Sequence, residues 1–271
     1  MPDDLRSLTT YDVRAMKRDG KRIVALTAYD ALFGALVDEA GADIILVGDS
    51  VNTVLAGQPT TLSATLEQMI YHGRMTRAGV RHALLVIDMP FLSYQVSIED
   101  AKRNVGRVMQ LTGASAVKLE GGATIVPTVR ALVEMGVPVM GHLGLTPQSV
   151  HQLGGNRVQG RTPEVADQLL ADARALEEAG VFSMVLELLP SAVAARISKS
   201  LTVPTIGIGS GPACDGQVLV LHDMLGLNDR FHAKFVKRYG ELGDAVRGAV
   251  RSFADEVRRG TYPDQAHSFE R

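Results

Sequence analysis

Residues 173–209 read ARALEEAGVFSMVLELLPSAVAARISKSLTVPTIGIG and contain the pattern that decides the fold. A stretch rich in Ala, Leu and Glu ends at Ala179-Gly180, where a glycine in the left-handed conformation can stop a helix. The apolar run Ser183–Leu188 comes next, followed by a second helical stretch and the apolar run Pro204–Ile208. Apolar runs without polar alternation are typical of parallel strands that are covered on both faces. The stretch therefore predicts a strand, a helix and a second, parallel strand.

The same unit recurs toward the N-terminus. Five further strands are predicted there, at Arg22–Thr27, Asp43–Val47, Ala83–Asp88, Ala116–Leu119 and Val137–Met140. An eighth strand can come from Val218–Leu221 or from Phe231–Val236, and periodicity does not choose between them. Seven or eight such units in 271 residues predict an α/β fold, a (β/α)8 TIM barrel. The rival, a doubly wound open sheet, usually has a Gly-rich phosphate turn after its first strand, and Thr27-Ala28-Tyr29-Asp30 stands there instead.

The sequence also indicates where several helices begin and end. Five helices are predicted to stop at glycines in the left-handed conformation, namely Gly41, Gly79, Gly113, Gly136 and Gly180. Ser97 is placed to cap a helix over Ala101–Gln110, and Thr162-Pro163 to begin one that runs toward Ala179. No linker divides the chain, so residues 1–271 are expected to form a single barrel domain with a short N-terminal helix and a C-terminal helix.

The predicted C-terminal helix, Glu241–Arg259, is amphipathic. Its apolar stripe comprises Leu242, Ala245, Val246, Ala249, Val250 and Phe253. Such a stripe is expected to cover the barrel or to face another subunit.

Charge and composition exclude several classes of partner. The chain has 28 Lys+Arg against 30 Asp+Glu, a net charge of −2, and no basic run longer than Arg258-Arg259, which argues against a nucleic-acid binder. Its longest apolar runs are about five residues, far below the roughly 20 that span a membrane. The single cysteine, Cys214, cannot form an internal disulfide, which fits a reducing compartment. A soluble, cytoplasmic protein is expected.

Five consecutive predicted strands finish in polar residues. These residues are Asp49 and Ser50, Asp88, Lys118 and Glu120, His142, and Glu187. Each has a structural reading when taken alone, such as a helix cap or a core histidine. Because a barrel brings the carboxyl ends of its strands to one mouth, the set together predicts a single polar site. Glu187 is the hardest to explain as structural, since it stands in an apolar run where an unpartnered carboxylate is costly.

These residue types point to enolisation of a 2-oxo acid. Asp49, Asp88 and Glu120 are three hard oxygen donors, which suit Mg²⁺ better than zinc. A bound Mg²⁺ would polarise the keto group of a 2-oxo acid and stabilise the enolate. Lys118 could hold the carboxylate or the enolate oxygen, and Glu187 is the natural general base for the carbon proton.

An ordered set of motifs that contains these residues runs along nearly the whole chain. It includes Leu26-Thr27-Ala28-Tyr29-Asp30, Val47-Gly48-Asp49-Ser50, Asp88-Met89-Pro90-Phe91, Val117-Lys118-Leu119-Glu120-Gly121-Gly122, Gly141-His142-Leu143-Gly144-Leu145-Thr146-Pro147-Gln148-Ser149, Leu186-Glu187, Ile206-Gly207-Ile208-Gly209 and Asp215-Gly216-Gln217-Val218-Leu219-Val220. The set resembles the ketopantoate hydroxymethyltransferase family, whose members add a hydroxymethyl group to 3-methyl-2-oxobutanoate in pantothenate biosynthesis.

The resemblance implies a (β/α)8 barrel that binds Mg²⁺, takes its one-carbon unit from 5,10-methylenetetrahydrofolate and releases 2-dehydropantoate. It also implies a homo-oligomer, typically a decamer. It implies that the metal is bound by Asp49, Asp88 and Glu120. It implies that the oxo acid is bound by Asp49, Ser50, Asp88, Lys118 and His142. The catalytic proton acceptor that it implies is Glu187. The chain departs from the family pattern at Leu92, where the family often has Gly or Met, and at Ser210, where it has Ala.

Two alternatives remain open. Another Mg²⁺-dependent enolising barrel, of the phosphoenolpyruvate mutase or isocitrate lyase type, would gather similar acidic residues, but such lyases typically need a Lys-Cys-Gly-His motif. Here Cys214 lies in Gly211-Pro212-Ala213-Cys214-Asp215 instead. A non-catalytic barrel that only binds an oxo acid would have little use for Glu187. The long segment Leu143–Arg161 is predicted to lie over the barrel mouth and to exclude water.

Overall fold

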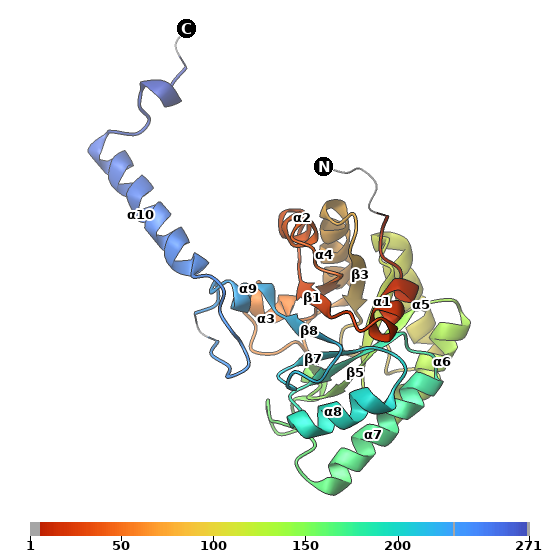
Figure 1. Ribbon diagram of the computed structural model, residues 1–271. Helices are drawn as coiled ribbons and strands as arrows, with labels where there is room; N and C mark the ends of the chain where they lie inside the picture. Colours follow the sequence, from red (N-terminus) through yellow and green to blue (C-terminus); the bar gives the residue numbers. More distant parts are fainter. Residues whose placement is uncertain (1–5, 230, 270–271) are drawn as a thin grey trace. The chain divides into compact units, whose positions relative to one another are not determined.

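A computed structural model describes residues 6–229 and 231–269. Eight parallel strands close into a barrel and follow one another in the order of the sequence (Figure 1). They are β1 Ile23–Thr27, β2 Ile44–Val47, β3 Leu84–Asp88, β4 Ala116–Glu120, β5 Val139–Gly144, β6 Ser183–Glu187, β7 Thr205–Ile208 and β8 Gly216–Leu219. This closed barrel confirms the predicted (β/α)8 fold. The first of the two candidate segments supplies β8, and Phe231–Val236 lies outside the strands and helices.

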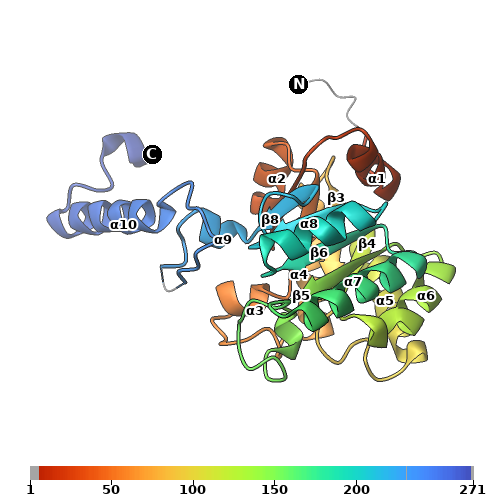
Figure 2. The ribbon, with the colours of Figure 1, turned by 60° about the horizontal axis from the view of Figure 1, so that its bottom comes forward.

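Helices surround the strands, as Figures 1 and 2 show. In the part up to Val220 they are α1 Thr10–Arg18, α2 Ala31–Glu39, α3 Val51–Val54, α4 Leu66–Gly79, α5 Ile98–Thr112, α6 Val126–Glu134, α7 Pro163–Glu178 and α8 Ser191–Ser200, with short 3₁₀ turns η1 Ala123–Ile125 and η2 Pro147–Ser149. The connection from β7 to β8, residues 209–215, contains no helix.

Helix α1 closes the end of the barrel at which the strands begin. Val13 of α1 is fully buried in a cluster with the first residues of several strands, including Ile23, Ile44 and Leu84. Lys17 anchors the same helix, because its Nζ donates to the carbonyl of Ser198 at 2.8 Å and contacts Asp215 Oδ2 at 3.0 Å. With this end closed, the carboxyl ends of the strands are left to form a site.

The predicted helix signals hold with one exception. Four of the five glycines have a positive φ, namely Gly41, Gly113, Gly136 and Gly180. The prediction for Gly79 is wrong, because this residue is the last of α4 and the extended Val80 follows it. A Cβ atom on Gly79 would lie 2.0 Å from the carbonyl oxygen of Ala31, so glycine is needed here for the close contact of α4 with α2. The caps are confirmed: Ser97 Oγ accepts from the Asp100 amide, and Thr162 precedes Pro163 at the start of α7.

The chain forms a second compact unit from Leu221 onward. Its helices are α9 Leu221–Met224, α10 Leu242–Arg259 and the 3₁₀ turn η3 Gln265–His267. Helix α10 confirms the predicted C-terminal helix, and several residues of its apolar stripe are exposed: Leu242, Val246, Val250 and Phe253. That residues 1–271 form one domain stays a prediction. None of the helices in the described parts is long and apolar enough to cross a membrane.

Candidate active site

The barrel brings the predicted polar residues to the carboxyl ends of neighbouring strands. Asp88, Glu120 and Glu187 are the last residues of β3, β4 and β6. Asp49 and Ser50 follow β2. The strand register places Asp88 beside Lys118, Glu120 beside His142, and Gly144 beside Glu187.

His142 lies inside β5 rather than after it. The strand runs to Gly144, whereas the predicted run ended at Met140. Gly144 has a φ of +96°, and a Cβ atom there would lie 2.1 Å from the carbonyl oxygen of Glu187. Glycine therefore lets β5 continue along β6 as far as the end that carries Glu187.

Lys118 is a buried cation at the centre of the cluster. Its Nζ lies 3.2 Å from Asp88 Oδ1, 3.7 Å from Glu120 Oε1 and 3.0 Å from His142 Nδ1. Burial lowers the pKa of Lys118, but the surrounding carboxylates outweigh burial and raise the pKa above its ordinary value. Lys118 is therefore charged at any pH where the protein works.

His142 connects this cluster to Glu187. Its Nδ1 lies 3.3 Å from Glu120 Oε1, and its Nε2 lies 3.2 Å from Glu187 Oε2, at ion-pair distance but without hydrogen-bond geometry. Burial and the Lys118 ammonium lower the pKa of His142, but the two glutamates outweigh them and raise it to about 9.

Glu187 stands in an apolar run of the sequence, but its carboxylate has a polar partner in the structure. Its strand neighbours are buried and apolar, yet its carboxylate contacts the His142 ring and its side chain is 16% exposed. The reason is that the last side chain of a barrel strand points to the mouth, where polar groups of adjacent strands meet.

The side chain of Ser210 holds the turn that follows Glu187. Leu188 has a φ of +47°, in the left-handed region. Ser210 Oγ spans this turn, since it donates to the carbonyl of Leu186 at 2.8 Å and accepts from the Leu189 amide at 3.1 Å. These two hydrogen bonds fix the backbone on either side of Glu187.

Asp49 and Asp88 form the acidic side of the site. Both carboxylates are buried, and the Asp49 amide donates to Asp88 Oδ2 at 3.1 Å. Burial raises the pKa of each aspartate, and repulsion from Glu120 raises it further, while Lys118 opposes both effects. Ser50 stands beside them, with its Oγ 2.8 Å from the Tyr29 hydroxyl. Burial and repulsion therefore disfavour the charged forms of these two carboxyl groups, an effect that a bound cation would reverse.

The donor set fits a hard divalent cation. Asp88 Oδ1 is buried and finds no hydrogen-bond partner among the described residues, although Lys118 Nζ lies 3.2 Å away. Within residues 6–229 and 231–269, no three His, Cys, Asp or Glu side chains form a ready metal cage. Mg²⁺ usually binds through one or two carboxylates and keeps several waters, so it needs no such cage. Asp49, Asp88 and Glu120 offer three buried carboxylates, which are the hard oxygen donors that Mg²⁺ prefers.

Two residues of the cluster carried no predicted role. Gln148, in η2 of the predicted mouth segment, donates from Nε2 to Asp49 Oδ2 at 2.9 Å and from its backbone amide to Glu120 Oε2 at 3.0 Å. Tyr94, in the loop after β3, has its hydroxyl 2.8 Å from Gln148 Oε1. The one sequence signal for Gln148 was its place in the motif that includes His142. That the segment excludes water stays a prediction.

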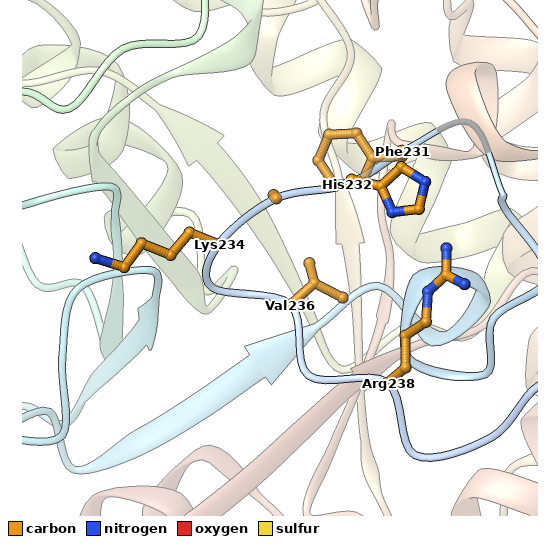
Figure 3. A pocket seen from close by; sticks show the side chains of 6 residues that line it. Phe231, His232, Lys234, Val236 and Arg238 are labelled. Carbon is orange, nitrogen blue, oxygen red and sulfur yellow. The ribbon is translucent and has the colours of Figure 1, made fainter.

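A cavity of about 380 Å³ lies in the C-terminal unit. Figure 3 shows residues that line it, which are Phe231, His232, Ala233, Lys234, Val236 and Arg238. The guanidinium of Arg238 is already paired, at 3.3 Å from Glu241 and 3.8 Å from Asp229. None of the candidate site residues belongs to this lining.

Comparison with known proteins gives close relatives along the whole chain. The chain is 55% identical to the 3-methyl-2-oxobutanoate hydroxymethyltransferase of Moorella thermoacetica over 97% of both chains. It is 52% identical to the enzyme of that name from Pelobacter propionicus, over 99% of this chain and 100% of the relative.

Solved structures with the same fold are distant in sequence. Phosphonopyruvate hydrolase, in complex with oxalate and Mg²⁺, gives a TM-score of 0.62 at 15% identity, covering 96% of this chain and 93% of that one. A 2,3-dimethylmalate lyase gives 0.60 at 15% identity, covering 96% and 92%. The family model for ketopantoate hydroxymethyltransferase matches residues 7–265. The chain therefore belongs to the ketopantoate hydroxymethyltransferase family.

Proposed function

We propose that this protein transfers a one-carbon unit from 5,10-methylenetetrahydrofolate to 3-methyl-2-oxobutanoate, giving 2-dehydropantoate for pantothenate biosynthesis. The observation that carries the proposal is the 3.2 Å contact between Glu187 and His142, which joins a partly exposed carboxylate to the buried cluster around Lys118. The names of the close relatives support the same activity.

The residues that would hold Mg²⁺ are Asp49, Asp88 and Glu120. When bound, the ion would polarise the keto group of the oxo acid and make the C3 proton more acidic. The electrostatics of the donor set support this assignment, because burial and then repulsion among the carboxylates raise the pKa values of Asp49 and Asp88, and a bound cation would favour their charged forms.

Lys118, Ser50, Asp88 and His142, together with Asp49, are proposed to bind and orient the oxo acid. The Lys118 ammonium is a fixed cation that suits the substrate carboxylate. Ser50 is oriented by the Tyr29 hydroxyl. Because all of these groups stand on barrel strands or directly after them, they are held in place without substrate.

Glu187 is proposed to remove the C3 proton of the oxo acid. A general base must be reachable by its substrate, and Glu187 keeps 16% of its side chain exposed while Asp88 and Glu120 are at 4%. His142 stands on its inner side and holds the carboxylate toward the cluster. Water releases the methylene carbon of the folate as a formaldehyde equivalent, which breaks both of its C–N bonds and leaves tetrahydrofolate. The carbon that lost its proton then forms a bond to the formaldehyde carbon, and the oxygen that came from water takes up a proton to become the hydroxyl group.

The experiment is proton NMR of 3-methyl-2-oxobutanoate in D₂O with the protein and Mg²⁺, with and without the folate donor. We expect loss of the C3 proton signal that needs both protein and metal, and a hydroxymethylated product only with the donor. Glu187→Gln should lower the exchange rate at least about 100-fold, while Glu178→Gln, an exposed glutamate of α7, should leave it unchanged.

Each other outcome selects a different function. Metal-dependent exchange without any donor-dependent product would indicate another enolising barrel that acts on 2-oxo acids. Binding of the oxo acid without exchange would indicate a non-catalytic barrel. Near-normal exchange in Glu187→Gln would remove Glu187 from its role.

The protein is further proposed to be a cytoplasmic homo-oligomer, on the family pattern a decamer, built from single-domain subunits of residues 1–271. The exposed apolar stripe of α10 supports an assembly, because such a stripe is normally covered.

A further inference from the structure

We propose that Gln148 is a positioning residue that holds the metal-binding carboxylates Asp49 and Glu120 in the orientation that a divalent cation needs. The inference rests on the proposed function, since it takes these carboxylates as metal ligands. It extends that function to a residue of the mouth segment to which the family resemblance gave no role.

The first observation is which groups Gln148 contacts. Its Nε2 donates to Asp49 Oδ2 at 2.9 Å and to the carbonyl of Met89 at 2.9 Å. Its backbone amide donates to Glu120 Oε2 at 3.0 Å. Met89 directly follows Asp88, so this one residue touches the ends of all three strands that carry the proposed metal ligands.

The second observation is that the orientation of the amide is fixed. Oε1 of Gln148 is the nearest acceptor for the single proton of the Tyr94 hydroxyl, at 2.8 Å, and it also accepts from Gln95 Nε2 at 3.3 Å. Both Nε2 protons are used on the other side, by Asp49 and Met89. Exchanging the amide oxygen and nitrogen would set the amide oxygen against two acceptors, Asp49 Oδ2 and the Met89 carbonyl oxygen, so Nε2 must face Asp49.

The third observation is that the arrangement is buried. Gln148 and Tyr94 are 6% and 2% exposed, so water does not compete for these hydrogen bonds. A carboxylate turns freely about its own bond, and a fixed donor on one oxygen sets its plane and leaves the other oxygen for a ligand. Partners of this kind typically change metal affinity by 10–100-fold when they are removed.

The test uses Gln148→Met, which keeps the length of the side chain and removes the side-chain donors and acceptor. The backbone amide that donates to Glu120 remains, so this variant tests the contact with Asp49. Mn²⁺ serves as the probe, and its free concentration is followed by electron paramagnetic resonance during a titration. We expect the dissociation constant for Mn²⁺ to rise 10–100-fold over the unsubstituted protein. Circular dichroism should stay unchanged. The matched control is Gln152→Met, an exposed glutamine four positions further along, which should bind Mn²⁺ like the unsubstituted protein.

A second variant covers the case in which Gln148→Met does not fold. Tyr94→Phe removes the hydroxyl that faces Gln148 Oε1 and that also hydrogen-bonds the backbone carbonyl and amide of Glu120, at 3.0 and 3.2 Å. Because both Nε2 contacts of Gln148 remain, the dissociation constant should rise by a smaller factor in the same direction. Equal Mn²⁺ affinity in these variants and the unsubstituted protein, or equal weakening in Gln152→Met, would overturn the inference alone. If the unsubstituted protein neither binds Mn²⁺ nor exchanges the C3 proton, the proposed function itself is wrong and the inference is overturned with it.

Discussion

The Asp49 carboxylate opposes folding of the metal-free protein at neutral pH. Burial, Glu120 and Asp88 hold the pKa of Asp49 well above its ordinary value of 3.8. An acid whose pKa is higher in the folded than in the unfolded state stabilises the fold below the unfolded value and loses that contribution as the pH rises through the folded value. From about pH 4 upward, the group therefore increasingly destabilises the fold.

Asp49→Asn is accordingly expected to raise the free energy of unfolding in EDTA at pH 7.5, because the neutral amide carries no charge for burial and the neighbouring carboxylates to oppose. The gain should shrink as the pH is lowered toward 4. Added Mg²⁺ should raise the melting temperature of the unsubstituted protein and not that of the variant. Urea denaturation and thermal melts measure these quantities. A variant that is less stable than the unsubstituted protein in EDTA would contradict the electrostatic argument.

Leu92 occupies a backbone conformation that suits glycine. Its φ is +70° and its side chain is 59% exposed, so it gains little from packing. The left-handed conformation costs an ordinary residue about 1–2 kcal/mol, while glycine loses about 0.5–1 kcal/mol more entropy on folding. Leu92→Gly should therefore raise the free energy of unfolding by up to about 1 kcal/mol, and Leu92→Val should lower it. A loss on Leu92→Gly in urea denaturation would show that the left-handed conformation carries no strain.

Sequence reasoning located the strand-end residues because a barrel forces strand ends together whatever the loops do. Their geometry agrees with a common site, and their individual roles stay predictions. Gln148 escaped the same reasoning, because 99 positions separate it from Asp49 and its contacts depend on how a long loop folds back. No local sequence pattern predicts which strand-end residues a loop of this length will contact.

At the scale of elements, the glycine pattern shows both the strength and the limit of the sequence. Four glycines end their helices as predicted, because the backbone requires a positive φ there. Gly79 has the same sequence context but serves the packing of α4 on α2. Which helix packs against which follows from the barrel, so a local signal cannot separate these two uses of glycine.

One substitution at two glycines should therefore have opposite effects. Gly79→Ala would place a methyl group 2.0 Å from the Ala31 carbonyl oxygen, and the forced shift should lower the free energy of unfolding by about 1–3 kcal/mol. Gly106→Ala, inside α5, meets no atom within 4 Å and should raise it by about 0.5–1 kcal/mol. Urea denaturation of both variants makes the comparison. Equal effects would mean that helix propensity alone decides at both positions.

At the scale of the whole molecule, the barrel was predictable because each strand pairs with the next one along the chain. The eighth strand was ambiguous because two short apolar segments, Val218–Leu221 and Phe231–Val236, follow β7, and periodicity does not choose between them. The compact unit from Leu221 onward was not predicted, since no linker composition marks Val220. What covers the apolar face of α10 depends on other surfaces, and neither periodicity nor composition names them.

The stripe on α10 leads to the last prediction, that it lies between subunits. Val250 is 60% exposed, and Val246 and Phe253 beside it are more than half exposed. Val250→Glu would place a charge in that interface, so the mass from light scattering should fall from that of the expected decamer to a smaller species. Arg251→Glu, on the opposite face of the helix, also makes the charge more negative and should leave the mass unchanged. An unchanged mass for Val250→Glu with a lowered melting temperature would show instead that the stripe packs on its own chain.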